Sequence, residues 1–79
     1  MEIILSKQVQ KALAKMDSTL KKRIRKAIEK LPDGDVRVLQ NYNPKSYRLR
    51  IGKYRIIYRE ISDSKISIDK IDSRGDIYK

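Results

Sequence analysis

Apolar residues recur along the first part of the chain at steps of three and four, which is the period of an amphipathic helix. The first stripe comprises Val9, Ala12, Leu13 and Met16, and the second comprises Leu20, Ile24, Ala27, Ile28 and Leu31. Ser6 can cap the first helix, and Asp17-Ser18-Thr19 interrupts the pattern and can cap the second. Pro32 to Asp35 ends the second helix, and we interpret Asp33 and Asp35 as ordinary turn residues around Gly34. The pattern predicts two helices that form a hairpin with one apolar side.

The period changes to two between Ser46 and Ile61, where apolar and basic residues alternate in two runs joined by Gly52-Lys53. Two such runs separated by a dipeptide that begins with glycine predict a β-hairpin closed by a type II′ turn. A two-residue loop also sets the register of the strands. The expected opposite pairs are Tyr47 with Tyr58, Arg48 with Ile57, Leu49 with Ile56, Arg50 with Arg55, and Ile51 with Tyr54.

This register gives the hairpin one apolar face and one basic face. Because cross-strand partners point to the same side, four arginines are expected on one surface, namely Arg48, Arg50, Arg55 and Arg59. Such a surface is either a solvated outer face or a binding surface for a polyanion. Guanidinium groups match phosphate oxygens well, and like charges at close range repel each other unless an anion is bound.

The remaining segments complete the predicted fold. Glu2 to Leu5 is suited to a short first strand, and Val36 to Leu39 is ambiguous between a helical turn and a strand. Ile66 and Ile68 alternate as a last strand, while Ile71 is out of phase, so a bulge or strand end is expected near Lys70. Asn41 to Pro44 is expected to be a loop. We therefore predict a single α+β domain over residues 1–79, in the order β-α-α-β-β-β, with the helical hairpin packed on one face of a small antiparallel sheet.

Composition and charge limit the functions that fit this fold. The 79 residues include 20 Lys and Arg against 10 Asp and Glu, a formal charge of +10, which favours an anionic partner such as nucleic acid. The chain has no cysteine and no histidine, so thiolate zinc sites and imidazole catalysis are excluded. We expect no metal, no cofactor and no membrane segment. The residues at the N-terminus do not resemble a secretory signal, so we expect a cytoplasmic protein.

Two segments carry a family resemblance. Residues 47–58 read YRLRIGKYRIIY and are similar to the Y-R-L-R-x-G-x-Y-R-x-x-Y signature of RelE-type toxins in the RelE/ParE superfamily. Residues 74–78 read RGDIY and are similar to the end of the family's closing H-R-G-D-x-Y segment. The resemblance implies a toxin of a type II toxin–antitoxin system that enters the ribosomal A site and cuts messenger RNA without a metal. The 2′-hydroxyl attacks the adjacent phosphate and leaves a 2′,3′-cyclic phosphate.

The same resemblance assigns roles to individual residues. Arg48 and Arg50 fall where the family keeps basic residues along the scissile phosphate, and Arg55 matches the arginine that stabilises the transition state. Arg74 matches the arginine near the leaving 5′-oxygen, and Tyr78 matches the C-terminal tyrosine that orients the nucleotide. Further contacts to RNA are expected from surface cations, namely Lys53, Arg59, Lys21, Lys22, Arg25 and Lys26.

Two departures from the family pattern leave the general base open. Position 50 is often lysine in the family, whereas arginine keeps its proton near neutral pH. Ser73 stands where many relatives have histidine. Arg50 could act only electrostatically, Tyr78 could contribute, or the ribosome could supply the base.

The implied partners are a cognate antitoxin with acidic, amphipathic segments, the ribosome with its 16S rRNA, and mRNA. Two other functions fit the same sequence. A toxin of the ParE branch would poison gyrase and would not need phosphate-directed arginines. A non-catalytic basic module would bind nucleic acid with a steep salt dependence.

Overall fold

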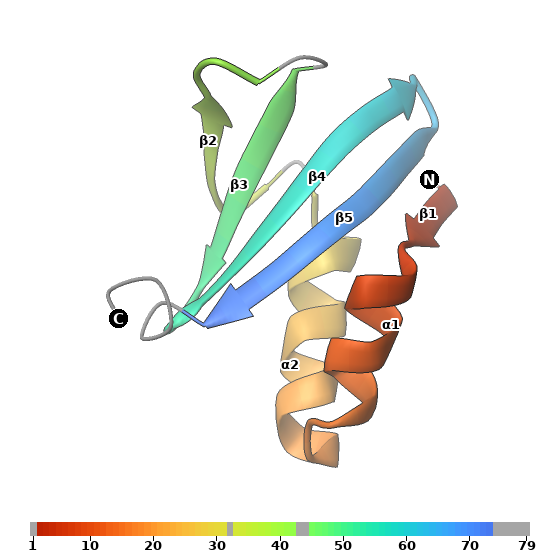
Figure 1. Cartoon of the computed structure of the whole chain (residues 1–79), viewed down its shortest axis with the longest axis vertical. Coiled ribbons are helices and arrows are strands. Elements are labelled where there is room, and N and C mark those ends of the chain that lie inside the picture. The colour runs from red at the N-terminus through yellow and green to blue at the C-terminus, as the bar shows by residue number, and fades with distance from the viewer. Residues whose placement is uncertain (1, 32, 43–44, 74–79) are drawn as a thin grey trace.

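The computed structural model describes residues 2–31, 33–42 and 45–73 (Figure 1). In this part of the chain two helices and five strands follow one another. They are β1 (Glu2–Leu5), α1 (Lys7–Ala14), α2 (Ser18–Glu29), β2 (Asp35–Leu39), β3 (Ser46–Ile51), β4 (Tyr54–Ser62) and β5 (Lys65–Ser73). Pro32 and the Asn43-Pro44 dipeptide, for which a helix end and a loop were predicted, lie outside the described residues. None of the described helices is long and apolar enough to cross a membrane.

The strands form one sheet in the order β1-β5-β4-β3-β2. The predicted α+β class and helical hairpin are confirmed, and the ambiguous segment Val36–Leu39 is a strand that pairs with β3 at one edge. The sheet is mixed and not purely antiparallel, because β1 runs parallel to β5 at the other edge. A short apolar run predicts a strand but does not indicate its direction, which depends on the distant segment it pairs with.

Both helices lie on the same side of the sheet (Figure 1). The first begins after the predicted cap Ser6, and the second begins within the predicted break Asp17-Ser18-Thr19, with Asp17 as its cap. The Ser6 hydroxyl accepts a hydrogen bond from the Val9 amide at 3.2 Å, and the Asp17 carboxylate accepts one from the Leu20 amide at 2.8 Å. These caps satisfy amide groups that have no partner within the first turn of a helix. The predicted break between the two helices is therefore confirmed.

The core lies between the helices and the sheet. Side chains of both predicted helical stripes meet the apolar face of the strands, and the most completely buried are Val9, Ile24, Leu49, Ile56 and Ile68. Tyr47 and Tyr58 stack on this side with ring centroids 5.3 Å apart. The apolar residues on this face of the hairpin therefore serve packing, as their alternation predicted.

The β3–β4 hairpin has the predicted register at all five pairs. Gly52 has a φ of +57°, whereas Lys53 is not among the described residues with positive φ, as a type II′ turn requires. The β4–β5 pairing shifts between Ile57 and Tyr58, because Asp69 is an extra residue on β5. This bulge, adjacent to Lys70, is the predicted cause of the change of phase at Ile71.

Candidate functional site

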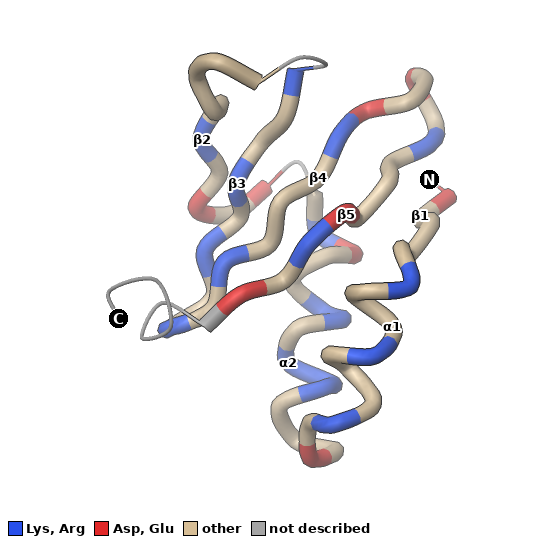
Figure 2. Tube along the Cα trace, viewed as in Figure 1, with Lys and Arg blue, Asp and Glu red and all other residues tan. Residues whose placement is uncertain are grey.

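The face of the sheet opposite the helices carries two rows of side chains that cross the strands. The register places Asp35, Arg50, Arg55 and Asp72 in one row across β2, β3, β4 and β5. The adjacent row contains Arg37, Arg48, Ile57 and Lys70. Figure 2 shows basic residues along β3 and β4 with acidic residues at their flanks. We call Arg48, Arg50 and Arg55 the arginine cluster, and the structure brings these three predicted site residues together.

Arg48 is the most enclosed member of the cluster, with 11% of its side chain exposed. Its Nε atom is buried and has no hydrogen-bond partner among the described residues. Burial and the nearby positive charge of Arg50 lower the pKa of Arg48, and the Asp35 carboxylate partly opposes this effect. Because the Arg48 charge is largely removed from water, an anion at its exposed end would interact with it more strongly than with a fully solvated arginine.

Arg55 resembles Arg48 in this respect. Its Nε is also buried without a hydrogen-bond partner in the described part of the chain, and its Nη2 lies 3.7 Å from the Asp72 carboxylate. Ile57, between the two arginines on the same face, is only 8% exposed although it is not part of the helix-side core. Its cross-strand neighbours are Arg48 and Lys70, whose aliphatic stems can cover it. An apolar side chain beneath the cluster restricts how far these stems can move.

The flanking carboxylates hold the arginines only loosely. Asp35 lies 3.5 Å from Nη2 of Arg48 and 4.0 Å from Nε of Arg50. These separations exceed a normal hydrogen-bond length, so Asp35 does not saturate the guanidinium donors of Arg48 and Arg50. The interpretation of Asp35 as a turn residue is wrong, since Asp35 begins β2 and lies opposite Arg50. Residue type and a neighbouring glycine gave no indication of this strand pairing.

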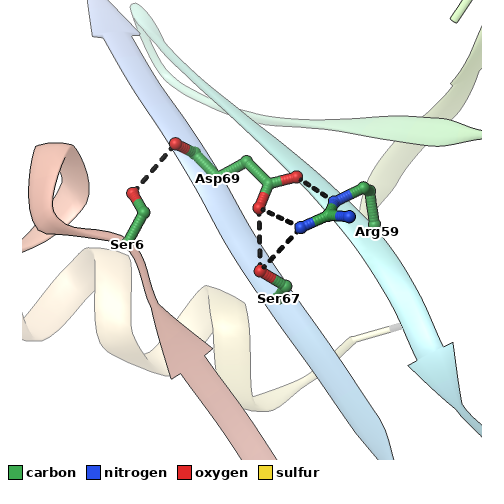
Figure 3. A network of polar contacts seen from close by, with 4 residues as sticks. All are labelled: Ser6, Arg59, Ser67 and Asp69. Carbon is green, nitrogen blue, oxygen red and sulfur yellow. Dashed lines mark hydrogen bonds and ion pairs between the residues drawn. The ribbon is translucent and has the colours of Figure 1, made fainter. Parts of the chain in front are cut away.

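Arg59, predicted to share the arginine surface, belongs to a separate polar network (Figure 3). Its Nε and Nη2 atoms donate to the Asp69 carboxylate at 2.5 and 3.1 Å, and the Ser67 hydroxyl donates to the same carboxylate at 2.7 Å. The hydrogen bond from Arg59 to Asp69 raises the pKa of Arg59. The backbone carbonyl of Asp69 also accepts a hydrogen bond from Ser6, at the start of α1. Arg59 is therefore engaged with the bulge and is not part of the cluster.

The predicted RNA-binding cations of α2 lie on the other side of the sheet from the cluster. Lys21, Lys22 and Arg25 are distributed along the helix, and Arg25 lines a small apolar groove beside Ile3 and Ile28. Lys26 differs, because it lines a cleft of about 470 Å³ that also includes Arg50. This cleft therefore connects Lys26 of α2 with Arg50 of the arginine cluster.

The sequence did not single out Arg23, another residue of this cleft. Its Nη2 atom lies 3.2 Å from the point where a Cβ on Gly52 would stand, so its guanidinium packs over the hairpin turn. Lys53 occupies the same turn, with its Nζ 5.7 Å from the ring centre of Tyr54. Arg74 and Tyr78, the remaining predicted catalytic residues, lie outside the described residues. Within residues 2–31, 33–42 and 45–73 no three acidic side chains gather closely enough to hold a metal ion.

Comparisons with known proteins agree with this architecture. The family described as "ParE toxin of type II toxin-antitoxin system, parDE" matches residues 3–78. A chain in the crystal structure of the RelB–RelE antitoxin–toxin complex from Methanococcus jannaschii is similar over 95% of this chain and 94% of its own length, with 26% identity and a TM-score of 0.74. Curated protein sequences give no significant match. The chain therefore belongs to the ParE toxin family and is a RelE-type toxin of the RelE/ParE superfamily from a type II toxin–antitoxin system.

Proposed function

We propose that this toxin is an endoribonuclease that cuts messenger RNA in the ribosomal A site. The observation that carries the proposal is the arginine cluster, in which two guanidinium groups have buried Nε donors without partners among the described residues. Because these Nε atoms are covered by protein, a phosphate group would bind the outer Nη donors, and the Nη2 atoms of Arg48 and Arg55 lie 3.5 and 3.7 Å from their neighbouring carboxylates. The similarity to the RelB–RelE complex supports the nuclease branch of the superfamily.

The cluster suits the chemistry of phosphodiester cleavage. Arg50 and Arg55 are cross-strand partners, so their backbones lie about 5 Å apart and both side chains can reach the same phosphate. When the 2′-hydroxyl attacks, the pentacoordinate transition state carries more negative charge than the substrate. Fixed cations that face this charge stabilise the transition state more than the ground state.

Arg48 would strengthen this effect from beneath the substrate. Because its guanidinium is largely removed from solvent, its interaction with the phosphate is screened less than that of an exposed cation. Arg74 and Tyr78 keep the roles that the family resemblance implies, at the leaving oxygen and the nucleotide. Lys53 and the basic residues of α2 would contact ribosomal RNA through salt-sensitive phosphate interactions.

Toeprinting and primer extension on translating ribosomes test this proposal directly. We expect the wild-type toxin to produce cuts within codons in the A site, with 2′,3′-cyclic phosphate ends. Arg55→Gln should lower the single-turnover rate by about 10²–10³-fold, by loss of one cation that faces the transition state. Lys11→Gln, which removes one positive charge from α1 on the other side of the sheet, is the matched control and should keep the rate. Growth arrest with intact messenger RNA would contradict the proposal.

Gyrase poisoning is the alternative, and the family match to a ParE toxin is the observation that favours it. The two functions differ in their need for phosphate-directed arginines. Simultaneous replacement of Arg55 and Arg74 by alanine should abolish toxicity if the toxin is a nuclease. Retained toxicity with double-strand DNA breaks would select gyrase poisoning.

The partner that we infer is a cognate antitoxin with acidic, amphipathic segments. The formal charge of +10 favours such a protein, and large apolar side chains are exposed near both edges of the sheet, including Ile4 on β1 and Val38 on β2. A complex of nanomolar affinity or tighter is expected at moderate salt. Titration of the toxin with the acidic protein encoded beside it would measure this affinity, and a lack of binding would contradict the inference.

A further inference from the structure

The arginine cluster provides cations for the phosphate but no group that accepts a proton. Arginine keeps its proton at any pH at which an enzyme works, and the chain has no histidine. Cleavage by a 2′-hydroxyl nevertheless requires that this hydroxyl lose its proton as it attacks. The acceptors that the described residues place close to the arginines of this face are three carboxylates, those of Asp35, Asp69 and Asp72.

Two of these carboxylates are poorly suited to reach a substrate. Asp69 accepts hydrogen bonds from Arg59 and Ser67 and is therefore engaged. Asp72 lies 3.7 Å from both Arg55 and Lys70, and only 21% of its side chain is exposed. Asp35 is 52% exposed and its nearest cations are at 3.5 and 4.0 Å, so it is the most accessible of the three.

We propose that Asp35 is the general base of the cleavage reaction, an inference that rests on the proposed endoribonuclease function. Its position fits this role, because Asp35 is the direct cross-strand neighbour of Arg50, which in turn is opposite Arg55. A phosphate held between the two arginines places its attached ribose within one strand spacing of β2, about 5 Å. A carboxylate at that distance can come within hydrogen-bond reach of the 2′-hydroxyl.

The step balances with water as the only other participant. The 2′-oxygen forms a bond to phosphorus, its proton passes to the Asp35 carboxylate, and the bond between phosphorus and the 5′-oxygen breaks. The leaving oxygen takes a proton from water, and Asp35 later returns its proton to solvent. During attack Asp35 loses its negative charge while the phosphoryl group gains one. Arg48 and Arg50 face both groups, so they can follow the charge with little rearrangement.

The test combines cleavage rates with substrate binding on programmed ribosomes. Asp35→Asn removes the proton acceptor with little change in shape, and Asp35→Glu keeps an acceptor. Asp33→Asn is the matched control, a carboxylate two residues away that is not in the arginine row. Binding of the same variants to ribosomes that carry 2′-O-methylated messenger RNA reports whether they are folded and able to bind.

We expect Asp35→Asn to lower the single-turnover rate by about 10²–10⁴-fold while binding to the methylated messenger RNA is kept or tightened. Asp35→Glu should restore most of the rate, and Asp33→Asn should behave as wild type. Retained binding distinguishes loss of a base from loss of fold, because a misfolded variant would lose both cleavage and binding.

The pH profile of the rate provides a second measurement. Several charged groups of the described residues face Asp35 from the elements around it. They are Arg48 and Arg50 on β3, Arg37 on its own strand, Arg23, Lys26 and Lys30 on the side of α2, and Asp33 in the preceding turn. Lysine and arginine side chains do not ordinarily titrate below about pH 9, so a decrease in rate at acidic pH that disappears in Asp35→Asn is assigned to this carboxylate and not to the ribosome or the RNA. We expect this decrease in the wild type and in Asp33→Asn but not in Asp35→Asn.

Three results would overturn the assignment of Asp35. Asp35→Asn could cleave at the wild-type rate, its rate could fall only in proportion to weaker binding, or Asp72→Asn could be the variant that loses the acidic limb. In each case the wild type still cuts ribosome-bound messenger RNA, so the proposed function stands. If the wild type itself does not cut, both the proposed function and the role of Asp35 are refuted.

Discussion

Replacement of Gly52 by alanine tests whether the hairpin turn has the backbone conformation described above. Gly52 has a φ of +57°, a region that costs an L-residue roughly 1–2 kcal/mol. The new Cβ would also stand 3.2 Å from Nη2 of Arg23. Because that atom is the end of a flexible side chain, it can move away at a small additional cost. We expect Gly52→Ala to lower the free energy of unfolding by about 1–2 kcal/mol.

Such a loss is easy to measure in a domain of this size. Natural domains have roughly 0.05–0.15 kcal/mol of stability per residue, so a chain of 79 residues has a total of about 4–12 kcal/mol. The change corresponds to a fall in Tm of about 4–8 °C per kcal/mol. Urea unfolding followed by circular dichroism gives the free energy, with Gly52→Asn as the control because asparagine tolerates positive φ better than alanine.

Two results would refute the reasoning. A Gly52→Ala variant as stable as the wild type would mean that the turn does not require a left-handed residue. A double-mutant cycle with Arg23→Ala separates the steric contribution. If the loss disappeared in the Arg23→Ala background, the contact with Arg23 and not the backbone would be its cause.

Two further predictions follow from buried and paired side chains. Burial, together with the nearby Glu60, raises the pKa of Tyr58 to about 12, so the folded state holds the phenol proton more tightly than the unfolded state with its pKa near 10. The protonated phenol therefore contributes about 2–3 kcal/mol to the free energy of unfolding, a contribution that is complete below pH 10 and is lost as the pH rises to 12. Urea midpoints at pH 8 and pH 11 should differ more for the wild type than for Tyr58→Phe. Equal differences for the two proteins would contradict this prediction. Asp69→Asn removes the carboxylate that pairs with the partly exposed Arg59, so we expect a loss of about 1 kcal/mol in urea unfolding. The same change in an Arg59→Met background should cost much less, and an equal cost would show that the pair contributes no stability.

The sequence by itself determined the local structure of this toxin. Apolar steps of three and four predicted both helices, and Ser6 and the break Asp17-Ser18-Thr19 marked where they begin. The Gly52-Lys53 loop has only two residues, so it determined every pair of the β3–β4 hairpin and hence the arginine cluster. These signals act over a few residues, and neighbouring side chains and turn geometry are sufficient to produce them.

Only the tertiary structure decided which distant segments meet. It paired β1 with β5 in parallel, made Val36–Leu39 an edge strand, and set Asp35 beside the arginines. It also engaged Arg59 with Asp69 through the bulge on β5, and brought Arg23 of α2 over the hairpin turn. Strand partners are chosen by burial and hydrogen bonding between segments that are far apart in the chain, and a periodic pattern contains no information about that choice.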